Sequence, residues 1–319
     1  MMDMLERLSL AGIVPVIKVD DAADAVPLCR ALAEGGLPVA EITFRTAAAP
    51  DAIAAVGREL PDVLLGAGTV LTCAQVDRAV AAGAKYIVSP GLNPEVVRHC
   101  QQVGVPILPG CANPSDIEVA LSLGLSTVKF FPAEALGGLP LIKALAGPYV
   151  DMKFIPTGGI TEKNLLEYLA FPKIRACGGS WMVPDAAIKA KDWSKIRDLA
   201  AAAVQLMLGF ELAHVGVNCA DADTACQTAD AFGTLLQWPV KEGNSSLFAG
   251  TGIEIMKSVG RGAMGHLAIR TNSLPRAKAY LAGRGVCFIE DSLVVKDGKP
   301  VAIYLAEPVG GFALHLLQK

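Results

Sequence analysis

The residue with the clearest chemical potential is a lysine at the end of a short apolar run. Lys129 lies in Ser126-Thr127-Val128-Lys129-Phe130-Phe131-Pro132-Ala133-Glu134, a pattern that predicts a β-strand ended by the proline. An ammonium group held among apolar side chains loses hydration, which favours the neutral amine. A neutral lysine can attack a carbonyl and form a Schiff base. The alternative is a lysine that extends from a strand end into solvent.

A carboxylate and a guanidinium on another predicted strand suit the same chemistry. Glu41 and Arg45 have the same parity, so both side chains point to one face of the strand. The carboxylate could move protons beside a reactive lysine, and the arginine could bind a substrate carboxylate. A structural ion pair is the alternative. Thr69 and Thr157 add hydroxyl groups, although each alone is typical of a turn or a helix cap.

Two glycine-rich turns predict an anion site. Gly158-Gly159 and Gly178-Gly179-Ser180 follow two successive predicted strands. Backbone N–H groups in such turns bind phosphate, especially at the last two loops of a barrel. Glycine is also common in ordinary tight turns, but two such turns in neighbouring loops favour the phosphate site.

A repeated strand–helix pattern positions these residues. Eight units of nearly constant length indicate a parallel sheet, and eight is the number that closes a (β/α)8 TIM barrel, whose active site lies at the C-terminal strand ends. Lys18 and Lys129 are the lysines expected at that rim. A doubly wound sheet fits less well, because no Gly-x-Gly-x-x-Gly follows the first strand. The strands are expected at residues 13–18, 38–42, 63–66, 86–89, 105–108, 127–130, 153–156 and 174–177.

The motifs together resemble one enzyme family, the 2-keto-3-deoxy-6-phosphogluconate (KDPG) and 4-hydroxy-2-oxoglutarate (KHG) aldolases. These are class I, Schiff-base lyases without a cofactor, built as (β/α)8 barrels and usually assembled as homotrimers. The resemblance covers residues 5 to about 205. It rests on Val14-Pro15-Val16-Ile17, Glu41-Ile42-Thr43-Phe44-Arg45-Thr46, Gly66-Ala67-Gly68-Thr69-Val70, Ser89-Pro90-Gly91, Lys129-Phe130-Phe131-Pro132-Ala133-Glu134, Pro156-Thr157-Gly158-Gly159-Ile160 and Gly178-Gly179-Ser180-Trp181.

The resemblance implies a role for each matching residue. Lys129 would form the imine with the keto carbon, and Glu41 would act as the general acid and base. The substrate would be bound by Arg45 and Thr69 at the pyruvoyl end, by Pro90 at the rim, and by Thr157, Gly158, Gly159, Gly179 and Ser180 at the phosphate end. Two departures stand out: Phe44 replaces a common leucine, and Cys111-Ala112-Asn113-Pro114 differs from the usual fifth loop, which therefore receives no role.

The rest of the chain exceeds what this aldolase needs. We expect a barrel domain at residues 1–208 and a smaller α+β domain at residues 210–319. A weak repeat relates 213–218 to 265–270, each followed by a helix pattern and β-like runs. The runs are expected at residues 246–249, 252–257, 286–290, 293–296, 301–305 and 312–317, and 296–299 reads as a hairpin turn. Two βαβββ halves resemble the glyoxalase (vicinal oxygen chelate) fold.

That second resemblance implies a divalent metal site at one residue near the start and one near the end of each half. The matching positions hold His214, Glu254, His266 and His315. Imidazole and carboxylate suit zinc, nickel, iron or manganese. A glutamate is usual where His315 stands, and histidines on strands are often ordinary core residues. A metal-free ligand pocket or a docking module therefore stays open.

Composition bounds the remaining possibilities. The 319 residues are 52% hydrophobic and 18% charged, with a net charge of −3, so we expect a folded protein with no nucleic-acid partner. No apolar run is long enough for a membrane span, and the first residues lack the pattern of a signal peptide. The eight irregularly spaced cysteines predict reduced thiols in a cytoplasmic protein.

The sequence thus predicts a lyase that cleaves a phosphorylated or dicarboxylic 2-keto acid to pyruvate and an aldehyde. One competing hypothesis is a phosphate-binding barrel isomerase that uses Glu41 as a base and forms no imine. Another is a binding protein in which the C-terminal part senses a metabolite. The sequence does not rank KDPG against KHG.

Overall fold

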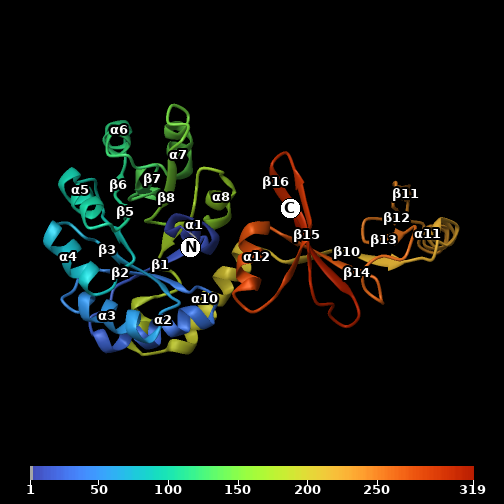
Figure 1. The fold of residues 1–319 in the computed structure, drawn as a ribbon, viewed down its shortest axis with the longest axis horizontal. Helices are drawn as coiled ribbons and strands as arrows, with labels where there is room; N and C mark the ends of the chain where they lie inside the picture. Colours follow the sequence, from blue (N-terminus) through green and yellow to red (C-terminus); the bar gives the residue numbers. More distant parts are fainter. Residues whose placement is uncertain (1–2) are drawn as a thin grey trace. The chain divides into compact units, whose positions relative to one another are not determined.

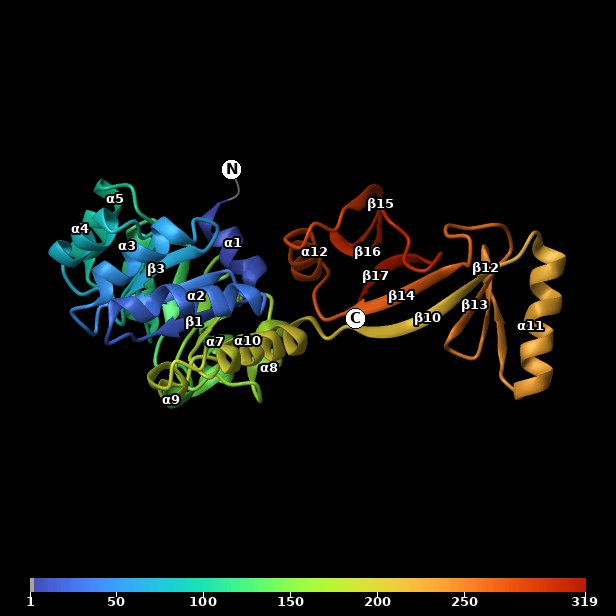
Figure 2. The ribbon, with the colours of Figure 1, turned by 90° about the horizontal axis from the view of Figure 1, so that it is seen from below.

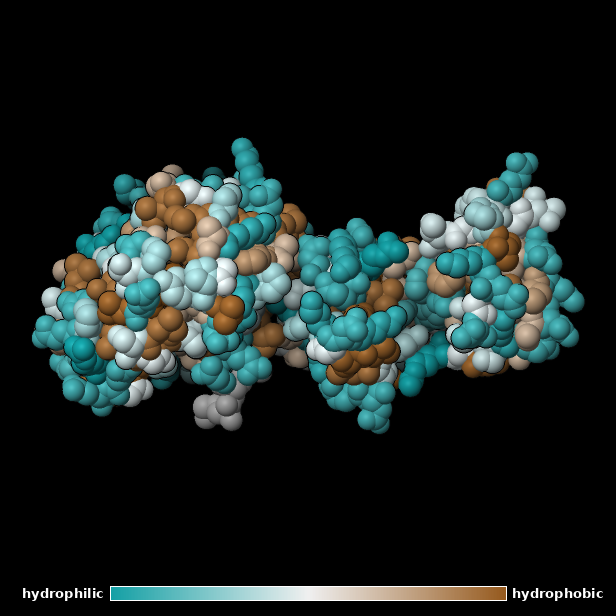
Figure 3. All heavy atoms as spheres, turned by 90° about the horizontal axis from the view of Figure 1, so that it is seen from above, coloured by the Kyte–Doolittle hydropathy of each residue, from teal (hydrophilic) through white to brown (hydrophobic). Residues whose placement is uncertain are grey.

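The chain folds into two compact units. The structure, a computed structural model, describes residues 3–319. One unit ends at Met207 and the other spans Leu208–Lys319, so the division falls in the last turn of helix α10 (Trp193–Leu208). In this described range no helix is both long and apolar enough to cross a membrane. Figure 3 shows hydrophobic and hydrophilic residues intermixed on the drawn face of each unit.

Strands and helices alternate through the first unit, as the sequence predicts. The strands are β1 (Ile13–Ile17), β2 (Val39–Thr43), β3 (Leu64–Gly68), β4 (Tyr86–Val88), β5 (Ile107–Leu108), β6 (Gly110–Cys111), β7 (Thr127–Phe130), β8 (Lys153–Pro156) and β9 (Cys177–Gly179). The helices are α1 (Met4–Ala11), α2 (Ala25–Glu34), α3 (Ala49–Glu59), α4 (Cys73–Ala81), α5 (Pro94–Gln102), α6 (Pro114–Ser122), α7 (Gly138–Ala146), α8 (Leu165–Ala170), α9 (Asp185–Lys189) and α10.

All strand pairs of the first unit are parallel. Six strands form a sheet in the order β5-β4-β3-β2-β1-β9, and β6-β7-β8 form a second sheet. Single parallel bridges join Phe154 to Ile174 and Thr157 to Gly178, between β8 and the region of β9. Figure 1 shows helices α2 to α7 around the outside of these strands. The first unit is therefore an α/β fold with a parallel sheet. Because the strands are parallel, their C-terminal ends lie on one side of the unit.

Two of the eight predicted strands differ from the expectation. The fifth, expected at residues 105–108, occurs as β5 and β6 separated by Pro109, which has no N–H for the sheet. The eighth, expected at residues 174–177, begins only at Cys177, because Ile174 contributes a single bridge to Phe154. The strand ends are otherwise displaced by one or two residues, as is common.

Alternating strand positions fill the interior of the first unit. Leu8 of helix α1 is fully buried and packs with one inward residue from each of several strands. The same parity continues along each strand toward its C-terminal end. On β2 it leads from Val39 to Glu41 and Thr43, so the apolar core at one end of the strands gives way to polar groups at the other. The buried cluster comprises Leu8, Val14, Val39, Leu64, Tyr86, Val88, Leu108, Ile155 and Ala176.

In the second unit, a strand, a helix and three further strands follow one another in that order, and this order occurs twice. The first set is β10 (Glu211–Asn218), α11 (Ala222–Leu236), β11 (Val240–Glu242), β12 (Ser246–Ala249) and β13 (Ile253–Met256). The second is β14 (His266–Thr271), α12 (Leu274–Ala282), β15 (Phe288–Lys296), β16 (Lys299–Leu305) and β17 (Ala313–Gln318). They share a mixed sheet in the order β11-β12-β13-β10-β14-β17-β16-β15, with α11 beside β12 and β13 in Figure 2.

Pairing in the second unit corrects two details of the sequence analysis. The predicted runs at residues 286–290 and 293–296 belong to the single long strand β15, whose pairing with β16 is irregular between Ile289 and Val295. Strand β11 was not expected, since its residues are exposed and lack an alternating pattern. The predicted turn between Lys296 and Lys299 is confirmed: Asp297 and Gly298 both have positive φ angles, 50° and 72°, as a tight hairpin requires.

All eight cysteines are free thiols. Cys29, Cys100, Cys111, Cys177 and Cys219 are buried, Cys73 and Cys226 are half-buried, and Cys287 is exposed. Burial raises the pKa of Cys29, Cys100 and Cys111 to about 12.

Candidate active site

A cavity of about 320 Å³ opens at the C-terminal ends of the strands of the first unit. Every residue of that unit to which the sequence analysis gave a catalytic or binding role lines it. Four further lining residues received no role: Val16, Thr43, Phe131 and Ile160. The predicted set is Glu41, Arg45, Thr69, Pro90, Lys129, Thr157, Gly158, Gly159, Gly179 and Ser180.

The floor of the cavity holds a buried lysine and a buried carboxylate. Lys129 Nζ on β7 lies 3.5 Å from Glu41 Oε1 on β2, and their side chains are only 8% and 5% exposed. The Nζ atom of Lys129 also lies 5.1 Å from the centre of the Phe131 ring. Burying such an ion pair is costly. Removing one partner strongly destabilises the folded protein, because it leaves the other charge buried and unpaired. The arrangement places a nucleophile and a proton acceptor side by side.

Glu41 has an oxygen available for a further group. Its Oε1 atom is buried and, although Lys129 Nζ lies 3.5 Å away, it accepts no hydrogen bond within residues 3–319. Gly68 on the neighbouring strand makes room for the carboxylate, since a Cβ there would lie 2.2 Å from Oε1. A buried carboxylate oxygen without a hydrogen bond is unfavourable. A substrate hydroxyl in the cavity would satisfy it.

Arg45 is held at the rim by a short chain of hydrogen bonds. Its Nε donates to Thr43 Oγ1 over 3.1 Å, and that hydroxyl donates to the carbonyl of Ile17 over 2.8 Å. Thr43 is buried, whereas Arg45 is exposed. The sequence analysis missed Thr43, although it shares the parity of Glu41 and Arg45 and could have been found by that signal.

Thr69 adopts an unusual backbone conformation next to the cavity. Its φ angle is +56°, which is rare for a β-branched residue. The amide of the next residue, Val70, donates to the carbonyl of Val88 over 3.1 Å. Conformations of this kind cost about 1–3 kcal/mol and concentrate at functional sites.

The loop after β7 and the glycine turn after β8 are hydrogen-bonded to each other. The amides of Ala133 and Glu134 donate to the carbonyls of Thr157 and Gly158 over 2.8 and 3.0 Å. The Tyr168 hydroxyl donates to the Glu134 carboxylate, and burial together with this bond raises the pKa of Tyr168. Gly159 has a φ of +80°, a value that suits glycine. The turn is thus fixed at the cavity wall, where the backbone of Gly158 and Gly159 lines the cavity.

Only one lysine among the described residues lines the cavity. Lys18, the other lysine predicted at the rim, lies outside the lining and pairs with Asp20 over 2.7 Å. Its side chain is 35% exposed. This geometry favours Lys129 over Lys18 as a nucleophile.

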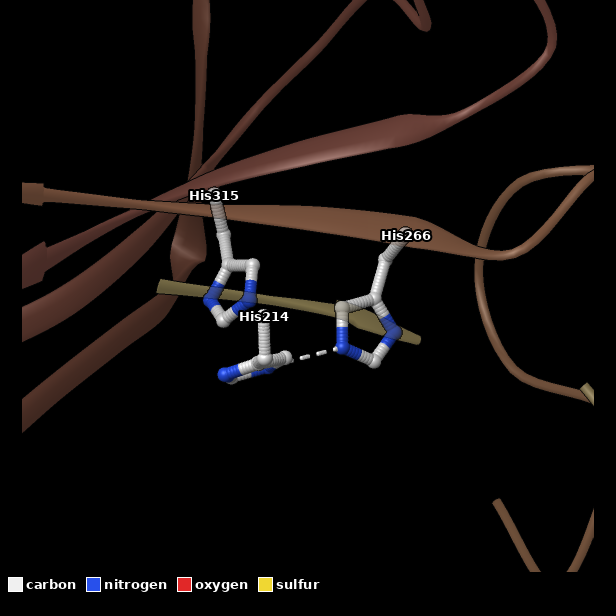
Figure 4. A group of neighbouring side chains, drawn as sticks. All are labelled: His214, His266 and His315. Carbon is white, nitrogen blue, oxygen red and sulfur yellow. Dashed lines mark hydrogen bonds between the residues drawn. The ribbon is translucent and has the colours of Figure 1, made fainter. Parts of the chain in front are cut away.

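The four predicted metal ligands of the second unit also lie together. The side chains of His214, His266 and His315 converge in Figure 4, and their ligand atoms all lie within 4.8 Å of one another. Glu254 Oε2 lies 2.9 Å from His214 Nε2 and 3.1 Å from His266 Nε2. Burial, reinforced by the two neighbouring histidines, lowers the pKa of His315 to about 4, so its imidazole is neutral at pH 7.

Comparison with known proteins identifies the first unit. Residues 4–199 match the family model described as KDPG and KHG aldolase. The chain belongs to the KDPG and KHG aldolase family. This confirms the resemblance found in the sequence motifs, and it makes the chain a member of a family of class I aldolases.

Individual members of this aldolase family are close in sequence. The chain is 52% identical to the 2-dehydro-3-deoxy-phosphogluconate aldolase of Treponema pallidum, over 65% of this chain and 99% of that protein. It is 41% identical to the KHG/KDPG aldolase of Escherichia coli, over 62% of this chain and 93% of the relative.

A solved structure of the family shows the same fold. The KDPG aldolase of Legionella pneumophila, with pyruvate captured as a covalent carbinolamine, matches with a TM-score of 0.62 and 42% identity. The match covers 63% of this chain and 98% of that one. The family model ends at residue 199, so membership says nothing about the second unit.

Proposed function

We propose that the first unit catalyses aldol cleavage of KDPG to pyruvate and glyceraldehyde 3-phosphate, of KHG to pyruvate and glyoxylate, or of both. The observation that carries this proposal is the buried pair of Lys129 and Glu41 in the cavity, whose Nζ and Oε1 atoms lie 3.5 Å apart while Oε1 accepts no hydrogen bond. The reaction needs no cofactor, because an imine on Lys129 supplies the electron sink.

The reaction begins when Lys129 Nζ attacks the keto carbon of the substrate and water leaves, which gives an iminium ion. Glu41 accepts the proton of the C4 hydroxyl. The C3–C4 bond then breaks, its electron pair enters the iminium as an enamine, and the aldehyde departs. Glu41 returns the proton to C3, and hydrolysis of the new iminium releases pyruvate and the free lysine.

The remaining cavity residues bind the two ends of the substrate. Arg45 and Thr69 would hold the carboxylate of the pyruvoyl part. The backbone around Gly158, Gly159 and Gly179, with the hydroxyls of Thr157 and Ser180, would hold the phosphate or the distal carboxylate. Pro90 would shape the rim between them. The two ends lie in loops of different strands, so the substrate would span the cavity above Lys129.

Borohydride trapping with pyruvate tests the mechanism. Reduction should leave one pyruvate adduct per chain, and peptide mapping should place it on Lys129. A Lys18→Ala variant should be labelled as well as the parent, and Lys129→Ala should lose both labelling and turnover. An adduct on Lys18 would move the site. A folded protein with no adduct, or Lys129→Ala with substantial turnover, would instead favour the isomerase without an imine.

The finer features of the architecture are proposals too. We infer that the parallel strands of the first unit close into a (β/α)8 barrel, because bridges at Phe154–Ile174 and Thr157–Gly178 span the remaining gap. The family relationship favours a cytoplasmic location and a homotrimer. Light scattering of the purified protein would test the trimer. A monomer in dilute solution would contradict it.

The second unit has its own candidate function. We propose that residues 210–319 form a glyoxalase-like domain of two βαβββ repeats and that it binds a divalent metal ion. The convergence of three histidines and Glu254 supports this role. Metal analysis of the intact chain, with His214→Ala and His266→Ala variants, tests it. Metal far below one ion per chain in all three proteins would rule the site out.

A further inference from the structure

We infer that three residues outside the cavity, Glu134, Tyr168 and Asn164, position the glycine turn at residues 157–160, which binds the distal phosphate or carboxylate of the substrate. The inference rests on the aldol cleavage proposed for the first unit. It goes beyond that proposal because these three residues lie outside the set that lines the cavity. Their removal would weaken binding of the distal anion and leave the chemistry at Lys129 in place.

The distal end of the cavity depends on groups without a full positive charge. Arg45 and Lys129 are the only cationic residues among the described residues that line the cavity, and both are assigned to the pyruvoyl part of the substrate. A phosphate at the other end would therefore be bound by hydroxyl groups and backbone N–H groups. Such groups bind an anion well only when the backbone already holds them in the right orientation.

Three successive carbonyls of the glycine turn accept hydrogen bonds from outside it. The loop after β7 donates to the carbonyls of Thr157 and Gly158 over 2.8 and 3.0 Å, and Asn164 Nδ2 donates to the carbonyl of Gly159 over 3.1 Å. In contrast, no described residue accepts a hydrogen bond from the amides of Gly159 and Ile160, and both residues line the cavity. These two N–H groups therefore remain available to an anion.

Asn164 holds the glycine turn at two points. Its Oδ1 atom accepts a hydrogen bond from the amide of Thr161 over 2.9 Å, while its Nδ2 atom donates to Gly159. A backbone amide can only donate and a carbonyl can only accept, so the two ends of the side chain have fixed roles. Asn164 directly precedes helix α8, and the position of the turn is thereby tied to a regular element.

Tyr168 lies one turn further along helix α8. Its amide donates to the carbonyl of Asn164 over 3.3 Å, and its buried side chain donates a hydrogen bond to the Glu134 carboxylate. Burial and this hydrogen bond raise the pKa of Tyr168, so the hydroxyl keeps its proton at neutral pH. Helix α8 therefore also fixes the loop after β7.

Glu134 connects the Tyr168 hydroxyl to the glycine turn. Its side chain packs across Gly159, where a Cβ would lie 2.6 Å from both Cβ and Cγ of Glu134. A Cβ at Gly138 would lie 2.9 Å from Glu134 Oε1 and 3.0 Å from the Tyr168 hydroxyl oxygen, so glycine makes room for this pair as well. Glu134 is itself exposed. Without the hydrogen bond from Tyr168, its side chain would regain rotamer freedom and the turn would lose a fixed neighbour.

Two tyrosine variants of the intact chain test this role. Tyr168→Phe removes only the hydroxyl and should raise the KM for KDPG or KHG, whichever the parent cleaves, by about tenfold, the scale of one lost hydrogen bond to a charged group. The change in kcat should be smaller. Tyr149→Phe is the matched control, because it removes a hydroxyl that donates to the Glu118 carboxylate over 3.0 Å, outside the cavity lining. It should keep the parent KM.

Variants of the other two residues separate the hydrogen bond from the charge. Glu134→Ala should raise KM as Tyr168→Phe does, whereas Glu134→Gln keeps an oxygen that accepts from Tyr168 and should keep the parent KM. Asn164→Ala should also raise KM, because it frees the Gly159 carbonyl. Glu167→Ala, at an exposed position of helix α8, serves as the control for this helix.

Pyruvate distinguishes positioning of the turn from general damage, because pyruvate has no distal end. The pyruvate concentration that gives half-maximal borohydride labelling of Lys129 should be the same in Tyr168→Phe and Glu134→Ala as in the parent. An unchanged KM in these two variants would overturn the inference, and so would a parallel loss of pyruvate labelling. If Tyr168→Phe does not fold, Glu134→Ala, at an exposed side chain, decides. A parent that cleaves neither KDPG nor KHG would instead overturn the proposed function.

Discussion

Glu41 shows how a single buried oxygen prepares a site for its substrate. Its Oε1 atom lies 3.5 Å from Lys129 Nζ but accepts no hydrogen bond in the described part of the chain. Glu41→Gln should lower kcat by about 10²–10⁴-fold, the usual contribution of a general base, because an amide cannot accept the C4 proton. Steady-state kinetics with KDPG and with KHG would measure this loss.

The same variant separates proton transfer from imine formation. Borohydride and pyruvate should still label Lys129 in Glu41→Gln, since the lysine is unchanged. Glu95→Gln, at an exposed helix position, serves as the control and should keep full turnover. Unchanged kcat in Glu41→Gln would remove Glu41 from the mechanism.

Thr43 touches Arg45 but need not touch substrate, so we treat it as a positioning residue. Thr43→Val removes the acceptor for Arg45 Nε and the donor to the Ile17 carbonyl while keeping the shape. We expect KM to rise about tenfold, consistent with one or two lost hydrogen bonds, with a smaller change in kcat. Thr43→Ser should restore the parent KM. Equal KM values in the valine and serine variants would contradict this role.

At the scale of elements, helix α1 closes the apolar end of the first unit. Leu8 is fully buried and packs in the apolar cluster inside this unit. Leu8→Ala should lower the free energy of unfolding of this unit by about 2–5 kcal/mol, through lost burial and the cavity that remains. Urea unfolding followed by tryptophan fluorescence and circular dichroism would measure the change. Leu5→Ala, at a partly buried position of the same helix, should cost less.

Strand parity made much of the first unit predictable from sequence. Apolar runs located the strands, and the polar residues that continue their inward parity, Glu41 and Lys129, meet in the cavity. The errors of the prediction concerned single residues. Pro109 divides a strand that hydrophobicity alone makes continuous, and Thr43 was missed although it shares the inward parity of Glu41 and Arg45.

The second unit was harder to predict because its strands are more exposed. Half-buried and exposed residues dominate β11 and β15, so the alternation that marks a strand is weak there. The histidines were nevertheless found from their places in the repeat. They converge because β10 and β14 pair as antiparallel neighbours. The sequence alone does not predict which strands of the two repeats become neighbours.

At the scale of the molecule, the first unit corresponds to the full length of its relatives. The Treponema pallidum aldolase aligns over 99% of its length with 65% of this chain. A chain truncated after Gly209 should therefore keep its kcat and KM for aldol cleavage, since the aligned residues span nearly the whole of that aldolase. Parallel assays and light scattering of the truncated and intact proteins would test this. Lost activity in a folded truncated protein would show that residues 210–319 support catalysis.

The distribution of the eight thiols has a practical consequence. Only Cys287, of the cysteines described, is classed as exposed, while five are buried and three of these have a pKa near 12. A maleimide dye at neutral pH should therefore attach first at this one position, since thiolates are the reactive species. The native protein then carries a fluorescent reporter in its C-terminal half. The four buried thiols of the aldolase half, Cys29, Cys100, Cys111 and Cys177, become labelled only as that half unfolds, so the same reagent follows its unfolding.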